Sequence, residues 1–132
     1  MQTPYAKKKG LNKILKIKTA DYTILPLTED MWATFSNKGA SGTGTGGGVV
    51  AFTLPSAKLG MGFHFIVQAA CRLSIAPASG ESIAVPSTGA QGTADYVIHA
   101  NAVGESVTLE CKVAGDWDCN TYIGTWTSGA AI

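Results

Sequence analysis

The feature that most constrains the fold of this chain is a strict alternation of side chains between Ser106 and Val113. The apolar members of the alternation are Val107, Leu109, Cys111 and Val113, and the polar members between them are Thr108, Glu110 and Lys112. A period of two places successive side chains on opposite faces of an extended strand. A turn signal follows at Ala114-Gly115-Asp116, and a second segment begins at Trp117. The segment 106–126 therefore predicts a β-hairpin with one face in a core.

The same pattern suggests a register for this hairpin. With Gly115 at the centre of the turn, Val113 is expected to face Trp117, and Cys111 to face Cys119. A loop of only Gly115-Asp116 would put Asp118 and Asn120 on the apolar face, where their desolvation without partners is costly. The odd-length loop is therefore preferred. It makes a bridge between Cys111 and Cys119 geometrically conceivable, but three cysteines are an odd number, and reduced, buried thiols are the default expectation.

Further strand signals recur along the chain at 21–25, 31–37, 49–54, 63–69, 71–76, 82–85 and 96–100. Side chains expected on the core face include Met31, Ala33, Phe35, Phe63, Phe65, Val67, Ala69, Cys71, Leu73 and Ile75, with Arg72 and Ser74 pointing outward. About eight to ten short strands at spacings of roughly 8 to 12 residues, with no convincing helix, predict an all-β domain. The expected architecture is a β-sandwich or barrel, jelly-roll-like, and its weakly charged strand faces favour burial in an oligomer.

Charge divides the chain into two parts. Six of the ten basic residues lie in the first eighteen positions, where there is no acid, and residues 19–132 carry four basic residues and all nine acids, a net charge of 4 − 9 = −5. We therefore divide the chain into an extended basic N-terminal arm, 1–18, and a β domain, 19–132. Such an arm docks on an acidic protein surface, a nucleic acid or an anionic membrane, or else is a solvated tail.

No catalytic, cofactor or metal site is expected. Asp116 with Asp118, and Asp95 with His99, are the nearest approaches to an acid/base pair, and neither lies in a recognisable motif. The glycine-rich stretch 38–48 has no phosphate-loop pattern and leads into a strand. There is no C-x-x-C, and no run of apolar residues reaches membrane-spanning length. The three tryptophans, Trp32, Trp117 and Trp126, offer a sugar-stacking platform as an alternative to core positions.

Residues 16–128 resemble a β-rich module of tailed bacteriophage virion proteins. The resemblance is carried by KTADYT near the start, by FSNKGASG, FTLP and IAP in the middle, and by GESVTLECK, Trp117-Asp118 and GTWT at the end. The resemblance implies a β-rich, often trimeric part of a head decoration protein, a head fibre or a tail fibre, with no catalytic element. It does not cover the basic arm.

The resemblance and the arm together lead us to expect a capsid decoration (cement) protein on the virion surface, assembled in the host cytoplasm. It would bind as a homotrimer and bridge subunits of the major capsid protein, rather than bind nucleic acid or a membrane. The alternatives are a receptor- or glycan-binding fibre tip, or a tail or neck component. The arm residues expected to contact the capsid are Tyr5, Lys7, Lys8, Lys9, Leu11, Lys13, Ile14, Leu15, Lys16, Ile17 and Lys18.

Overall fold

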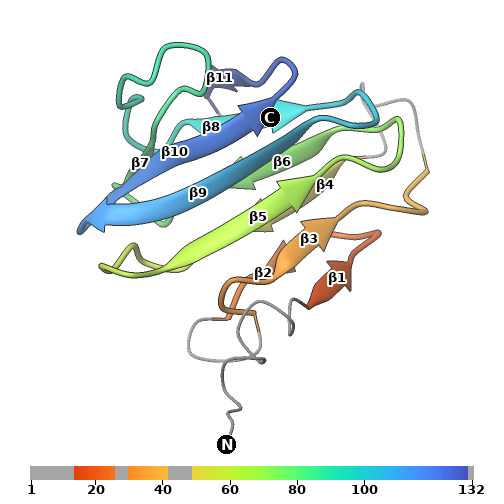
Figure 1. Cartoon of the computed structure of the whole chain (residues 1–132), viewed down its shortest axis with the longest axis horizontal. Coiled ribbons are helices and arrows are strands. Elements are labelled where there is room, and N and C mark those ends of the chain that lie inside the picture. The colour runs from red at the N-terminus through yellow and green to blue at the C-terminus, as the bar shows by residue number, and fades with distance from the viewer. Residues whose placement is uncertain (1–13, 26–29, 42–48, 131–132) are drawn as a thin grey trace, which may run out of the picture.

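The computed structural model describes residues 14–25, 30–41 and 49–130, and these form eleven strands in two sheets with no helix (Figure 1). The six-stranded sheet has the order β1 (Leu15–Ile17), β3 (Thr34–Ser36), β5 (Gly62–Ile66), β9 (Ser106–Val113), β10 (Asp116–Ile123) and β7 (Ser82–Ile83). The five-stranded sheet has the order β11 (Thr127–Gly129), β8 (Val97–Ala100), β6 (Leu73–Ala76), β4 (Val50–Thr53) and β2 (Tyr22–Thr23). The all-β prediction is confirmed.

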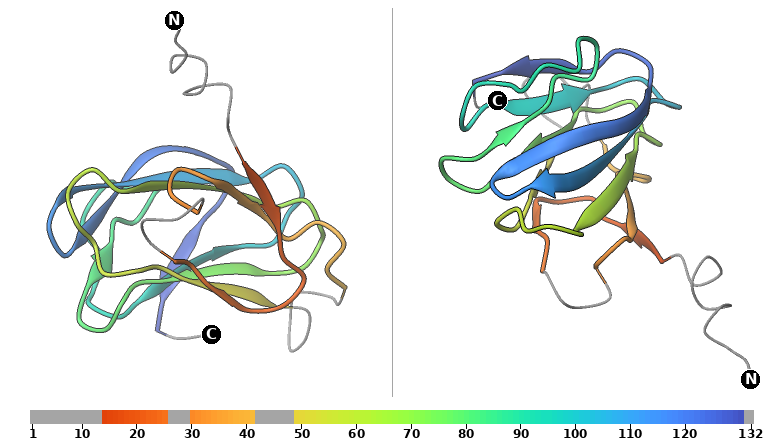
Figure 2. Two further views of the ribbon diagram at one scale, coloured as in Figure 1. Left: turned by 90° about the horizontal axis from the view of Figure 1, so that it is seen from below. Right: turned by 60° about the vertical axis from the view of Figure 1, so that its left-hand side comes forward.

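The first six strands wind between the two sheets. β1, β3 and β5 are parallel neighbours in the six-stranded sheet. β2, β4 and β6, which alternate with them along the chain, are parallel neighbours in the five-stranded sheet. Parallel strands need a long crossover connection. Here the strand on the opposite sheet supplies it, so each turn of the winding adds one strand to each layer. Figure 2 shows the two layers facing each other.

The later strands close this winding with antiparallel pairs. β8 adds to β6 and β9 adds to β5, and β10 then folds back on β9. Two short edge strands complete the sheets: β7 lies parallel to β10, and β11 lies antiparallel to β8. Within the described residues, no helix is long and apolar enough to cross a membrane.

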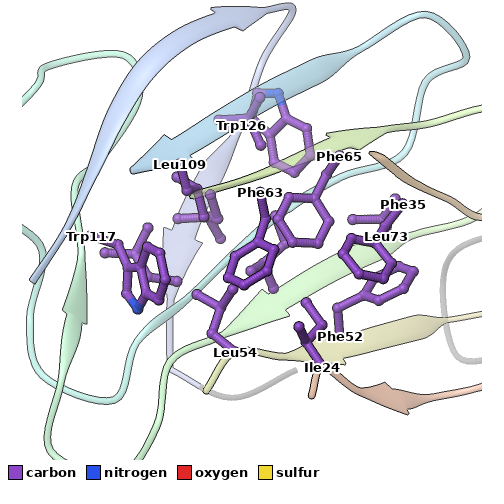
Figure 3. Close-up of a cluster of buried hydrophobic side chains, with 14 of the residues drawn as sticks. Ile24, Phe35, Phe52, Leu54, Phe63, Phe65, Leu73, Leu109, Trp117 and Trp126 are labelled. Carbon is purple, nitrogen blue, oxygen red and sulfur yellow. The ribbon is translucent and has the colours of Figure 1, made fainter. Parts of the chain in front are cut away.

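A row of aromatic side chains runs through the core between the sheets, among buried aliphatic residues (Figure 3). Phe35 and Phe65 are register partners on β3 and β5, and their rings stack at 5.5 Å. Phe52, from the opposite sheet, packs against both at 5.3 and 5.5 Å. Phe63 continues the row to Trp117, at 5.6 Å. Rings at these separations gain attraction beyond the burial of their area, so the row joins the parallel half of the sandwich to the C-terminal hairpin.

The predicted inward faces are largely confirmed: Ala33, Phe35, Phe63, Phe65, Val67, Cys71, Leu73 and Ile75 are buried. Other expectations were wrong: Val113, predicted on the core face, is 61% exposed, and Ala69 is only partly buried. The strand predicted at 31–37 is shorter, because Met31 and Trp32 lie in a turn before β3. Ser74, predicted outward, is buried, and its hydroxyl has no hydrogen-bond partner among the described residues.

The C-terminal hairpin forms as predicted, but in a different register. Val113 pairs with Asp116 rather than with Trp117, and Cys119 pairs with Leu109 rather than with Cys111. Irregularities between Asp116 and Asp118 and between Cys119 and Thr121 shift the register along the ladder. A bulge inserts an extra residue and changes which side chains face inward, so Trp117 still enters the core although the loop is short. The three cysteines are free thiols.

Candidate functional site

Part of the predicted arm lies within the described residues. Ile14, Leu15, Lys16, Ile17 and Lys18 are placed by the structure, whereas Tyr5, Lys7, Lys8, Lys9, Leu11 and Lys13 lie outside the described residues, as do residues 42–48 of the glycine-rich stretch. The placed residues include a strand of the sandwich, because β1 pairs with β3 from Leu15 to Ile17. The Thr34 N–H donates a hydrogen bond to the Ile14 carbonyl, and the Lys18 N–H donates one to the Ser36 carbonyl, both at 2.8 Å. These hydrogen bonds extend the pairing at each end.

The register of β1 decides where its side chains point. Lys16 is the partner of Phe35, which faces the core, so Lys16 also points inward. Leu15 and Ile17 point outward and are 55% and 47% exposed. Among the described residues β1 pairs only with β3, so it is an edge strand. Its exposed apolar side chains directly follow the lysine-rich part of the arm in the sequence. An edge strand of this kind can accept a further strand from a partner.

A buried ionic cluster lies beneath β1. The residue Asp30 is 1% exposed, and its carboxylate accepts hydrogen bonds from the Tyr22 hydroxyl at 2.6 Å and the Leu25 N–H at 2.9 Å. Lys16 Nζ lies 3.1 Å from its other oxygen. Burial raises the pKa of Asp30, but the hydrogen bonds from Tyr22 and Leu25 and the Lys16 ammonium outweigh it, so the net pKa is below the ordinary value. The carboxylate is therefore held ionised, as a structural anion for Lys16.

The outer face of the six-stranded sheet carries few charges. One row of register partners across the strands reads Leu15, Thr34, His64, Thr108 and Thr121, and the next row reads Ile17, Ser36, Ile66, Ser106 and Ile123. Carboxylates enter this face at the other end of β9, where Glu110 is the partner of both Gly62 and Asp118. The face is thus mostly hydroxyl and aliphatic, with a negative margin.

The three tryptophans do not form a common platform. Trp117 and Trp126 are buried in the core, and the Trp126 indole N–H donates to the Ser106 carbonyl at 3.0 Å. Trp32 is 48% exposed. It lines a hollow of about 350 Å³ together with Thr34, His64 and Thr108, and the His64 Nδ1 lies 2.7 Å from the Thr108 hydroxyl. Sequence patterns could not single out this hollow, because it depends on a turn conformation and on the pairing of β3, β5 and β9.

The residues considered for acid/base chemistry have structural contacts instead. Asp95 adopts a positive φ of 68° and accepts the Gly80 N–H at 2.6 Å, while His99 lies in β8, opposite Ser74 and Thr127. Burial first, and then the Arg72 charge, lower the pKa of His99. The structure does not show Asp116 with Asp118, or Asp95 with His99, converging on a common pocket. Within the described residues, no group of three or more His, Cys, Asp or Glu side chains is placed to hold a metal ion.

Comparison of the chain with models of known protein families and with curated proteins gives no match.

Proposed function

We propose that this chain is a phage capsid decoration protein that binds the outer surface of the head and bridges subunits of the major capsid protein. The observation that carries the proposal concerns the end of the basic arm that the structure describes. There the chain forms β1, an edge strand whose Leu15 and Ile17 are exposed, and the lysine-rich residues directly precede it in the sequence. The resemblance of residues 16–128 to phage virion modules supplies the setting.

The charge distribution gives this binding a direction. The first eighteen residues carry six lysines and no acid, whereas the rest of the chain has a net charge of −5. An acidic partner surface attracts the first part and repels the second, so the protein would approach with its N-terminal segment leading. Lysine contacts then fix the segment, while Leu15 and Ile17 at the sheet edge bury apolar area against the partner.

The winding of the sandwich makes β1 a firm anchor for such a contact. Lys16 is held by Asp30 beneath the strand, and Lys18 Nζ lies 3.9 Å from the centre of the Tyr22 ring. A pull on the N-terminal segment is therefore resisted by the cluster as well as by the β1–β3 pairing. A homotrimer at a local three-fold site would multiply each weak contact by three, which raises avidity without new contacts.

The proposal is tested by cosedimentation of the protein with empty heads of the phage that encodes it. Lys7, Lys8 and Lys9 are replaced together by glutamine, and the matched control replaces Lys38, Lys58 and Lys112 of the β domain by glutamine. The arm variant should lose at least about tenfold in affinity, and wild-type binding should weaken when ionic strength rises from roughly 0.05 to 0.3 M, because exposed charges are screened. Equal binding by the arm variant and wild type would refute the role of the arm.

Two observations test the rest of the proposal. Light scattering that finds only monomers at working concentration would exclude a trimer of the free protein. A cryo-microscopy map of the virion that places the protein on a tail, a neck or a fibre would refute the head location. A fibre tip with a glycan partner is the alternative that the exposed Trp32 favours, and the hollow beside this residue can be tested on the isolated protein.

A further inference from the structure

The backbone at Trp32 has a conformation that an aromatic residue rarely adopts. Residues 30–33 form a turn closed by a bond of 3.0 Å from the Ala33 N–H to the Asp30 carbonyl, and Trp32, its third residue, has a φ of 59°. A turn with positive φ at this position normally has glycine or asparagine there, because a side chain crowds the backbone. A tryptophan in the left-handed region is strained, and such strain is concentrated at functional sites.

The surrounding residues hold the indole in place without burying it. The backbone N–H of Trp32 donates a hydrogen bond to the Gly62 carbonyl at 2.9 Å, and the indole ring lies directly against Gly62. A Cβ on residue 62 would lie 2.1 Å from the ring, so only glycine permits this approach. Asp30, at the start of the turn, is fixed by Lys16 and Tyr22. The indole nevertheless stays about half exposed, so burial of the ring does not explain why the strain is maintained.

The hollow beside the indole has the composition of a small-ligand site. Its volume of about 350 Å³ is at the lower end of the range for ligand pockets. It is lined by Trp32 and by the cross-strand row of Thr34, His64 and Thr108. Each threonine hydroxyl can both donate and accept a hydrogen bond. The hollow therefore offers an aromatic wall and a row of polar groups set by the sheet spacing.

We propose that this hollow binds a neutral saccharide. The C–H bonds on one face of a pyranose ring carry partial positive charge and fit the negative face of an indole. The sugar hydroxyls would then form hydrogen bonds with Thr34 on β3 and Thr108 on β9, which lie on either side of β5. Glu110 and its partner Asp118 lie on the same face, Glu110 next to Gly62, and would repel anionic sugars and phosphates. The proposal does not depend on capsid binding.

The test begins with a glycan array of neutral and sialylated oligosaccharides probed with the labelled, full-length protein. Neutral glycans that bind are then titrated against the protein in solution by tryptophan fluorescence and by the NMR signal of the Trp32 indole N–H. Choline is titrated in parallel, because an indole near carboxylates is also a setting for a quaternary ammonium group. The proposal predicts saturable binding of neutral sugars with a shift of the Trp32 signal.

Two variants make the test specific. Trp32→Gly removes the ring and relieves the strained φ, so it should fold and lose at least tenfold in affinity. Thr108→Val removes one hydroxyl at nearly constant shape and should weaken binding severalfold, and its matched control is Thr121→Val, one strand further along the same row. Failure of every neutral glycan to bind, preference for sialylated glycans or choline, or undiminished binding by both Trp32→Gly and Thr108→Val would overturn the proposal.

Discussion

Replacing Asp30 with asparagine removes the anion from the cluster that closes one end of the sandwich. The oxygen that accepts from Tyr22 and Leu25 can be kept by the asparagine carbonyl. The other oxygen, 3.1 Å from Lys16 Nζ, becomes an amide group that can only donate, and it faces an ammonium that can only donate. The variant therefore loses stability mainly because Lys16 loses its partner: its side chain is only 17% exposed, so its ammonium cannot regain full hydration.

The size of the effect follows from this geometry. Removing one partner of a buried ion pair costs about 3 to 5 kcal/mol, and the partial exposure of Lys16 places this variant near about 3 kcal/mol. Because the pKa of Asp30 is lowered below its ordinary value of 3.8 on folding, its ionised form contributes stability above that pH. The contribution is lost as pH falls through the folded pKa. The difference between wild type and variant should therefore be full at neutral pH and shrink to under about 1 kcal/mol in strong acid.

The measurement is urea unfolding followed by tryptophan fluorescence, because Trp117 and Trp126 are buried. Adding Lys16→Met to Asp30→Asn removes the ammonium and should recover about 2 kcal/mol. Asp21→Asn is the matched control. Asp21 accepts one exposed backbone bond from Ala51, so this change should stay within about 0.5 kcal/mol. A loss of less than 1 kcal/mol at neutral pH, or a loss that is equal in acid, would refute the reasoning.

Three further predictions follow from the core and from the thiols. Phe65→Ala should cost about 3 to 5 kcal/mol in urea unfolding because Phe65 is a fully buried member of the aromatic row, whereas the half-buried Ile66→Ala should cost clearly less. Asn37→Ala should cost about 2 to 4 kcal/mol by the same assay, since the buried Asn37 side chain bonds the backbone of residues 68, 69 and 71, and a loss below 1 kcal/mol would contradict this. Burial, reinforced by nearby carboxylates, raises the pKa of Cys111 and of Cys119, so iodoacetamide should alkylate both much more slowly at pH 7 in the folded protein than in urea, and equal rates would be the contrary result.

Alternation along single strands could be predicted from the sequence, but pairing between strands could not. Phe63, Phe65 and Val67 alternate so regularly that their inward face follows from the period of two alone. Nothing in that pattern says that β5 lies parallel to β3 and antiparallel to β9, because a buried apolar face looks the same beside either kind of neighbour. The winding of β1 to β6 between the sheets therefore does not follow from the alternation.

The hairpin register shows a second kind of limit. The requirement that Trp117 and Cys119 face inward while Asp118 faces out was correct, and Cys119 does pack against the core. The assumption that the length of the loop alone sets which side chains face inward was wrong, because bulges within the strands shift the register instead. Bulges leave no fixed signature in a single sequence. The hollow at Trp32 was missed for a related reason, since a positive φ at tryptophan contradicts local propensity.

The winding topology explains why an ionic cluster and an exposed indole arise from the same turn. A stack that grows by one strand in each sheet must end somewhere, and its first strands, β1 and β2, place Lys16 and Tyr22 next to the core rings of Phe35 and Phe52. Both are amphipathic side chains that cover apolar surface and keep a polar tip. The Lys16 ammonium and the Tyr22 hydroxyl need a hydrogen-bond acceptor, and Asp30, the first residue of the turn at 30–33, provides it. Trp32 is the third residue of the same turn, and its indole is exposed. A change at Asp30 that loosens this turn should therefore also weaken saccharide binding at Trp32, although Asp30 itself is buried away from the hollow.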